Sequence, residues 1–307
     1  MKRSLKDYAV ISLKGMAMGA ADVVPGVSGG TIAFISGIYE ELLTTISNIN
    51  LSLLKTLKEK GLKETWKQAN ANFLLALLLG VAISVVSLAK GISFLLSTKP
   101  IMVWSFFFGL VLASIFYVGK QIKKWRIQEI VALLIACVVA YSITVAKPLV
   151  NDEASYLFLF LAGALAICAM ILPGISGAFI LVLLGAYEAI LTAVHSRDLQ
   201  AIAVVGIGCV VGLLSFSRVL KWLFNHYKDV TLAGLTGFIL GSLNKIWPWK
   251  ETLTTRINSK GIKVPVLQNS ILPTNYNGEA QLTIAIGLAI IGFLLIFGLE
   301  KLASHKS

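Results

Sequence analysis

Apolar residues run through nearly the whole chain, and short polar clusters interrupt them at intervals. A run of ~20 apolar residues is the length that crosses the hydrocarbon core of a bilayer as an α-helix. The runs lie at 8–24, 29–46, 73–96, 101–119, 127–146, 156–172, 177–194, 201–222, 230–247 and 281–300. This pattern predicts an all-α polytopic membrane protein.

Two of the apolar regions are cut in the middle by a proline and its neighbouring glycines. Residues 15–31 read GMAMGAADVVPGVSGGT, and residues 163–179 read GALAICAMILPGISGAF. Pro25 removes a backbone donor, and the glycines beside it permit tight turns. A backbone break inside a membrane is tolerated only where protein or a water-filled cavity surrounds it. We therefore predict two re-entrant helical hairpins, at 8–46 and 156–194, although two short full crossings would give the same topology.

The two broken regions belong to an internal repeat. Aligning residues 15–44 with 163–192 gives twelve identities in thirty, including Pro-Gly-x-Ser-Gly and Gly-x-Tyr-Glu. At an offset of 128, a second block pairs Gly80, Ser87, Lys90 and Gly109 with Gly208, Ser215, Arg218 and Gly237. Each half then holds a hairpin and three crossings, and an odd number of crossings inverts the second half. We predict an inverted-topology repeat with halves 1–147 and 148–307.

Two polar stretches do not fit the spans. Residues 48–70 combine the lysines Lys55, Lys58, Lys60, Lys63 and Lys67 with the apolar Leu51, Leu54, Leu57, Leu62 and Trp66. This composition predicts an amphipathic helix on the membrane surface. Residues 248–280 are predicted to be an external loop, next to Trp247 and Trp249, which we interpret as interfacial aromatic anchors.

Composition agrees with a membrane protein. Hydrophobic residues make up 57% of the chain and charged residues 14%, whereas soluble domains contain about 25% charged residues. The three cysteines, Cys137, Cys168 and Cys209, lie inside apolar runs and behave as small hydrophobic residues. Metal-ligand spacings, nucleotide-binding glycine loops and a nucleophile with its base do not appear in the sequence, so we predict no catalytic residue, no metal and no cofactor.

The net charge of +12 comes from lysines and arginines that cluster between the spans. We attribute them to topology and to anionic membrane lipids, and we expect no nucleic-acid partner. With a cytoplasmic N-terminus, seventeen of them face the cytoplasm, and the short external loops hold only Lys99, Lys147 and Arg197. Five more lie in the external loop at 245–280, which is long enough to count less. The positive-inside rule therefore predicts that both termini are cytoplasmic.

The breaks themselves are the candidate binding site. Ser28 and Ser176 stand where a helix N-cap is expected, directly before the second helix of each hairpin. The amides that follow would then be unpaired and would make an anion site near the middle of the membrane. These candidate substrate-binding residues are Ser28, Gly29, Gly30, Thr31, Ser176 and Gly177, with the amides of Ala178 and Phe179. Alternatively, the serines only cap and the glycines only allow close helix packing.

Charged residues within apolar runs are the second set of candidates, because such charges are costly. Lys90 and Arg218 are repeat counterparts near opposite faces, and they could attract an anion from either side or extend to the headgroups instead. Asp22, whose counterpart is Met170, is a candidate proton carrier or a local cap of the broken backbone. Glu40 and Glu188 are candidates for proton coupling or gating, or they are solvated acids at the interface.

One further charge pair follows from hairpin geometry. In continuous helical arms, Glu40 and Glu188 would stand about 17 Å beyond the serines, three turns along. Lys14 would stand level with Glu41, and the second repeat lacks both residues. We therefore expect Lys14 to pair across the hairpin with an acid, preferentially Glu41.

Four segments together resemble one known family. KGMAMGAADVVPGVSGGTIAFISGIYEEL at 14–42, ILPGISGAFILVLLGAYEAIL at 171–191, LTGFILGSLNKIWPW at 235–249 and FSRVL at 216–220 resemble the bacterial polyprenyl-phosphate transporter family, long catalogued as a domain of unknown function. The resemblance covers nearly the whole chain, and the doubled PG(V/I)SG signature is its specific part. Asp22, Ser28, Glu40, Ser176, Glu188 and Arg218 fall on positions typical of that family.

The resemblance implies a translocase of the bacterial cytoplasmic membrane that returns undecaprenyl phosphate from the outer to the inner leaflet. We expect this transport to be coupled to protons or to another ion. Two other classes remain open: a membrane-embedded lipid phosphatase or transferase, and a carrier for small organic anions. Product release from the lipid would identify the first, and transport of soluble anions would identify the second.

Overall fold

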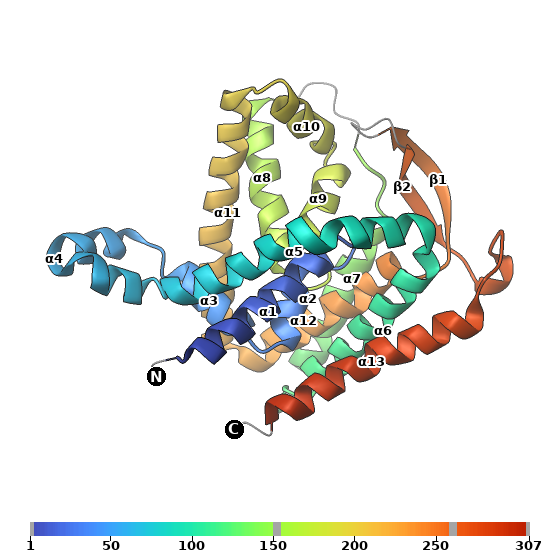
Figure 1. Cartoon of the computed structure of the whole chain (residues 1–307), viewed down its shortest axis with the longest axis horizontal. Helices are drawn as coiled ribbons and strands as arrows, with labels where there is room; N and C mark the ends of the chain where they lie inside the picture. The colour runs from blue at the N-terminus through green and yellow to red at the C-terminus, as the bar shows by residue number, and fades with distance from the viewer. Residues whose placement is uncertain (1–2, 150–154, 258–262, 305–307) are drawn as a thin grey trace.

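The computed structural model describes residues 3–149, 155–257 and 263–304, and these residues are mostly helical (Figure 1). The helices of the first half are α1 (Leu5–Asp22), α2 (Gly29–Ile35), α3 (Tyr39–Ser47), α4 (Leu51–Gln68), α5 (Ala71–Thr98), α6 (Pro100–Gly119) and α7 (Ile127–Val145). Those of the second half are α8 (Tyr156–Ile171), α9 (Gly177–Leu183), α10 (Tyr187–His195), α11 (Leu199–His226), α12 (Lys228–Ser242) and α13 (Leu282–Ser304), with 3-10 turns at Leu243–Ile246 and Pro273–Asn275.

Four of the described helices are long and apolar enough to cross a membrane: α5, α6, α7 and α11. The bent pair α9 and α10 would be a fifth, and α8 and residues 282–298 of α13 are apolar but shorter. Many large apolar side chains on these helices are exposed, for example Val86 at 79% and Leu157 at 69%. A multi-pass membrane protein explains both observations, because lipid covers such side chains.

The long helices pack in pairs through glycines. Helix α1 crosses α5 where Gly15 and Gly80 face the opposite backbone, and α8 crosses α11 where Gly163 and Gly208 do so. Helix α6 packs on α13 at Gly109, and α12 packs on α7 at Gly237. In each case a Cβ on the glycine would clash with a backbone carbonyl of the partner helix. The glycines that align between the two halves therefore occupy equivalent crossings.

The stretch predicted as an external loop contains a β-hairpin. Strands β1 (Lys250–Ile257) and β2 (Lys263–Ser270) pair antiparallel, with an irregular register at Thr254. Threonine and valine favour strands, and Trp249 anchors the hairpin by donating its indole N–H to the carbonyl of Ala280 at 2.9 Å. The prediction of an all-α protein is therefore corrected at this hairpin.

Helix α4 differs from the single surface helix that the sequence predicts. Its backbone breaks at Gly61 (φ 74°), and none of its residues is buried. The two parts fold against each other, because Gln68 accepts from the hydroxyl of Thr56 at 2.6 Å and donates to the hydroxyl of Ser52 at 2.9 Å. A glycine at positive φ ends one helical run and lets the chain reverse.

Both termini lie at the lower left of Figure 1, and the β1–β2 hairpin lies on the opposite side of the molecule. Helix α4 projects from the side of the termini. The arrangement places the basic N-terminal segment and the lysines of α4 away from the β-hairpin.

Candidate functional site

The two breaks form tight turns after α1 and α8. Gly26 and Gly174, each directly after a proline, have φ of 86° and 89°, values that favour glycine because they strain residues with a Cβ. Each turn ends at a serine, Ser28 or Ser176, in extended conformation directly before a seven-residue helix. The local sequence thus explains why both spans break at this point.

The two turns contact each other. The hydroxyl of Ser28 donates to the carbonyl of Met170 at 3.1 Å, and the amide of Gly174 donates to the hydroxyl of Thr31 at 2.9 Å. Tyr39, from α3, donates its hydroxyl to the carbonyl of Ile171 at 3.2 Å. Hydrogen bonds between residues more than 130 positions apart therefore join the first hairpin to the second.

Asp22 is the last residue of α1, and its carboxylate lies at the amino end of α2. Its carboxylate accepts from the amide of Gly29 at 2.6 Å, while the amide of Gly30 donates to the hydroxyl of Ser28 at 3.1 Å and that of Thr31 to the carbonyl of Ser28 at 2.9 Å. The expectation that these three amides are unpaired is wrong, because the turn brings the carboxylate back onto the helix end. Their role in substrate binding stays a prediction.

The second hairpin lacks this cap. Its counterpart of Asp22 is the apolar Met170, and the side chain of Ser176 makes no capping bond. Among the described residues, the amides of Gly177, Ala178 and Phe179 have no hydrogen-bond acceptor. The two repeats therefore differ: α2 is capped by a carboxylate, and the amino end of α9 is open.

Lys245 is a residue of this site that the sequence reasoning missed. A Cβ on Gly26 would lie 2.6 Å from the Cγ of Lys245, and a Cβ on Gly174 would clash with the hydroxyl of Ser242. The ammonium of Lys245 lies 3.9 Å from the ring centroid of Phe179. Both turns therefore pack against the end of α12. The signal in the sequence is a lysine directly after an apolar span, a position that is equally typical of an external loop charge.

The other predicted charges lie away from the turns. Glu40 is exposed and pairs with Lys228 at 2.7 Å, and Glu188 is exposed on α10. Arg218 is exposed and donates to the carbonyl of Ile49 at 2.9 Å, whereas Lys90 is exposed on α5. The structure does not bring these four side chains to the crossing of the breaks.

The second arm of each hairpin is also not a continuous helix. Gly37 (φ 73°) separates α2 from α3, and Gly185 (φ 71°) separates α9 from α10, which bend by 106° relative to each other. The expected straight path of three turns from each serine to its glutamate is therefore wrong. Positive φ at these glycines ends each short helix.

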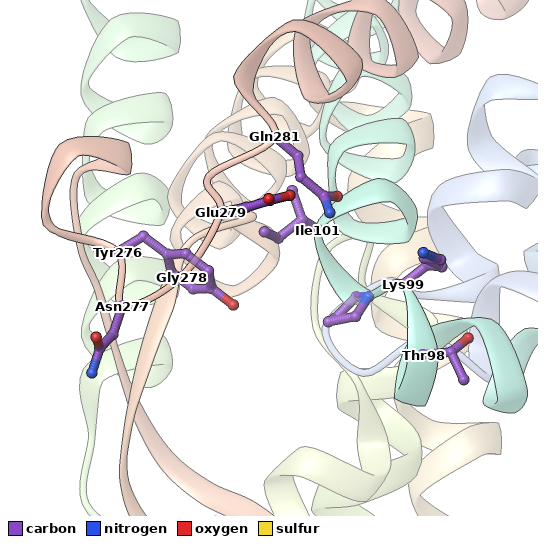
Figure 2. Close-up of a pocket in the computed structure, with 9 residues that line it drawn as sticks. Thr98, Lys99, Ile101, Tyr276, Asn277, Gly278, Glu279 and Gln281 are labelled. Atoms are coloured by element: carbon purple, nitrogen blue, oxygen red, sulfur yellow. The ribbon is translucent and has the colours of Figure 1, made fainter.

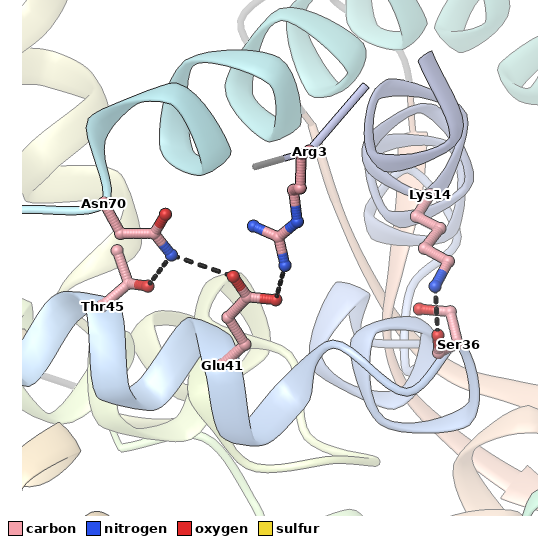
Figure 3. A network of polar contacts seen from close by, with 6 residues as sticks. All are labelled: Arg3, Lys14, Ser36, Glu41, Thr45 and Asn70. Atoms are coloured by element: carbon pink, nitrogen blue, oxygen red, sulfur yellow. Dashed lines mark hydrogen bonds and ion pairs between the residues drawn. The ribbon is translucent and has the colours of Figure 1, made fainter. Parts of the chain in front are cut away.

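The expected pair of Lys14 and Glu41 does not form (Figure 3). Lys14 donates to the carbonyl of Ser36 at 2.6 Å. Glu41 instead pairs with Arg3 at 2.6 Å and accepts from Asn70 at 2.9 Å, and the carboxylate raises the pKa of Arg3 above its ordinary value. Glu41 thus contacts the segment that precedes α1 and the residue that precedes α5, and hairpin geometry alone does not predict these contacts.

A separate pocket of about 220 Å³ lies where α5 meets α6, next to the segment before α13 (Figure 2). Lys99, Ile101, Tyr276, Glu279 and Gln281 are among its lining residues. None of the residues that form the two turns lines it. This pocket is therefore distinct from the crossing of the breaks.

Comparison with known proteins agrees with the sequence resemblance. Residues 18–264 match the model of a family described as undecaprenyl phosphate translocase-like. A polyprenyl-phosphate transporter of Vibrio cholerae is 50% identical over 97% of both chains. A polyprenyl-phosphate transporter of Staphylococcus aureus is 30% identical over 78% of this chain and 86% of its own length. No solved structure matches this chain.

Proposed function

The chain belongs to the undecaprenyl phosphate translocase-like family, and from this premise we propose that it returns undecaprenyl phosphate, or a similar polyprenyl phosphate, from the outer to the inner leaflet of the bacterial cytoplasmic membrane. Only the phosphate headgroup has to cross, since the polyprenyl tail is soluble in lipid. Relatives named transporters support a transport function for this chain and give no support to an enzyme.

The observation that carries this proposal is the hydrogen-bonded crossing of the two breaks. Ser28 and Thr31 are 1% and 0% exposed, so the polar contact lies inside an otherwise apolar protein. Broken helices at the middle of a membrane are typical of transporter binding sites. Asp22, Pro25 and Met170 beside the crossing are exposed, which supports access for a ligand.

Equivalent helix crossings in the two halves support the inverted repeat as part of the proposal. The aligned pairs Gly15 and Gly163, Gly80 and Gly208, and Gly109 and Gly237 face partner backbones in the same way. Helix α7 packs on α12, and α6 packs on α13, so the halves interlock. Rocking of one half against the other around the crossing would give alternating access, with both termini in the cytoplasm.

We assign roles to the predicted site residues on this basis. Ser176, Gly177 and the open end of α9 bind the phosphate first, and Ser28 with the amides of Gly29, Gly30 and Thr31 binds it in the alternate state. Lys90 and Arg218 attract the anion at opposite faces. Asp22 is the leading coupling residue, with Glu40 and Glu188 as the other candidates.

The contact between Asp22 and Gly29 suggests how coupling works. The carboxylate and a phosphate compete for the same amide, because both are anions at the end of α2. Protonation of Asp22 weakens its bond to the Gly29 amide and admits the phosphate. Proton binding and headgroup binding at α2 then favour each other.

Reconstitution tests the proposed function directly. Proteoliposomes containing the full chain should exchange a fluorescent polyprenyl phosphate between leaflets faster than empty liposomes, and a pH gradient should accelerate the exchange. Absence of exchange under both conditions would contradict transport of this lipid. Phosphate release from the lipid would indicate an enzyme, and uptake of soluble anions would indicate a carrier for small organic anions.

A first mutational prediction concerns Arg218. Replacing it with alanine is expected to slow lipid exchange about two- to fivefold, because exposed charges contribute at most about 1 kcal/mol. Membrane insertion should be unchanged, and the initial exchange rate at equal protein density measures the effect. An Arg218→Ala rate equal to that of the wild type would remove Arg218 from the mechanism.

A further inference from the structure

Two lysines lie next to each other after α12, Lys245 in the 3-10 turn and Lys250 at the start of β1. The ammonium of Lys245 lies 3.9 Å from the ring centroid of Phe179, and the ammonium of Lys250 lies 3.5 Å from that of Trp104. Lys250 also donates a hydrogen bond to the backbone carbonyl of Lys245. Both side chains are partly buried. The segment between them is therefore bent so that two positive charges share one environment lined by aromatic rings.

No acid balances these charges within the described residues. The ion pairs among the described residues join Arg3, Lys55, Lys67 and Lys228 to glutamates. Neither Lys245 nor Lys250 takes part in one of them. Burial and the neighbouring ammonium of Lys245 lower the pKa of Lys250 well below its ordinary value. Partly buried charges are ordinarily paired, so this cluster lacks an anion.

The position of the two lysines connects the crossing of the breaks to the β-hairpin. Lys245 touches Gly26 in the first turn and Phe179 in the first helical turn of α9. Lys250 is the first residue of β1, and β1 lies on the side of the molecule opposite the termini (Figure 1). The pair thus lies between the crossing and that side.

We propose that Lys245 and Lys250 together bind a phosphate monoester anion, the headgroup of the transported lipid, as it approaches the crossing from the β-hairpin side. This inference rests on the proposed function and adds to it the cations that receive the headgroup. A phosphate monoester carries up to two negative charges, which favour the ammonium form of both lysines, and each ammonium can then donate to a phosphate oxygen. The aromatic faces of Phe179 and Trp104 hold the cations in place until the anion arrives.

Binding by the detergent-solubilised full chain tests the proposal. The variants are Lys245→Met, Lys250→Met and the double variant, and the matched control is Lys99→Met, an exposed lysine at the pocket in Figure 2. Each site variant is expected to bind polyprenyl phosphate roughly tenfold more weakly, the worth of one charge-assisted hydrogen bond. The double variant should bind at least as weakly, and Lys99→Met should bind like the wild type.

The melting temperature separates binding from folding. Removing an unbalanced charge is expected to leave the melting temperature of each site variant equal to or above that of the wild type, because no acid loses its partner. Weaker binding together with a lower melting temperature in all three variants would assign the lysines a structural role and overturn the proposal. Wild-type affinity in the double variant would overturn it as well.

Two ligands distinguish a lipid site from a free-phosphate site. If the lysines bind the lipid headgroup, unlabelled polyprenyl phosphate should displace the labelled lipid at far lower concentration than inorganic phosphate does. The double variant should lose this displacement. If the wild type binds only inorganic phosphate and does so through both lysines, the anion site stands and the proposed lipid transport falls. If the wild type transports the lipid and the double variant transports it equally well, the lysine assignment alone falls.

Discussion

Replacing Asp22 with asparagine is expected to abolish the acceleration of lipid exchange by a pH gradient. The carboxylate accepts from the Gly29 amide at 2.6 Å, and it would have to be protonated before a phosphate could take that amide. Asparagine keeps an oxygen acceptor but has no charge and does not titrate. The ratio of the exchange rates with and without the gradient should therefore fall to about one, because residue 22 no longer binds and releases a proton.

The measurement is the exchange rate in proteoliposomes with and without the gradient, with Asp198→Asn as the control. Asp198 also caps a helix, accepting from the amides of Gln200 at 3.1 Å and Ala201 at 3.0 Å, but it precedes α11 and not the crossing. Its variant should keep the response to the gradient. A full response in Asp22→Asn would exclude Asp22 as the coupling residue and leave Glu40 and Glu188.

The second large effect is expected at a helix crossing. A side chain at Gly208 would clash with the backbone carbonyl of Phe160 on α8, so Gly208→Leu must push α8 and α11 apart. Overpacking of this kind costs about 3 kcal/mol. Gly206 lies two residues earlier on the same helix, where a Cβ would meet no neighbouring atom within 4 Å, which makes Gly206→Leu the matched control.

Thermal and denaturant unfolding in detergent measure this difference. Gly206→Leu should be neutral or slightly stabilising, because leucine has a higher helix propensity than glycine. Gly208→Leu should lower both the melting temperature and lipid exchange. Equal stability of the two variants would show that the α8–α11 crossing can open without cost, contrary to the close approach of the two backbones.

The broken spans were predictable because their cause is local. Pro25 and the glycines of the turns restrict or free the backbone through their own covalent structure, and the structure has Gly26 and Gly174 at positive φ. The family was predictable for a similar reason: the doubled PG(V/I)SG signature is contiguous, and the comparisons confirm it. The roles of the individual site residues remain predictions.

Other local signals in the sequence are compatible with more than one structure. Gly61, Gly37 and Gly185 each end a helix at positive φ, yet a single glycine in a helical pattern is also tolerated without a break. The threonines and valines of the stretch at 248–280 favoured strands, but its polarity suggested a loop. At the three glycines and in the stretch at 248–280, intrinsic propensity alone leaves two backbone conformations close in free energy, and tertiary packing selects one of them.

The sequence by itself determined the membrane class, the two breaks and the family, because each follows from composition or from residues adjacent in the chain. Only the tertiary structure decided that Asp22 caps α2, that Glu41 pairs with Arg3 instead of Lys14, and that Lys245 reaches the first turn and Phe179 of α9. The physical reason is that a charged side chain takes whichever partner packing brings within hydrogen-bond distance, and that distance depends on how separate helices cross.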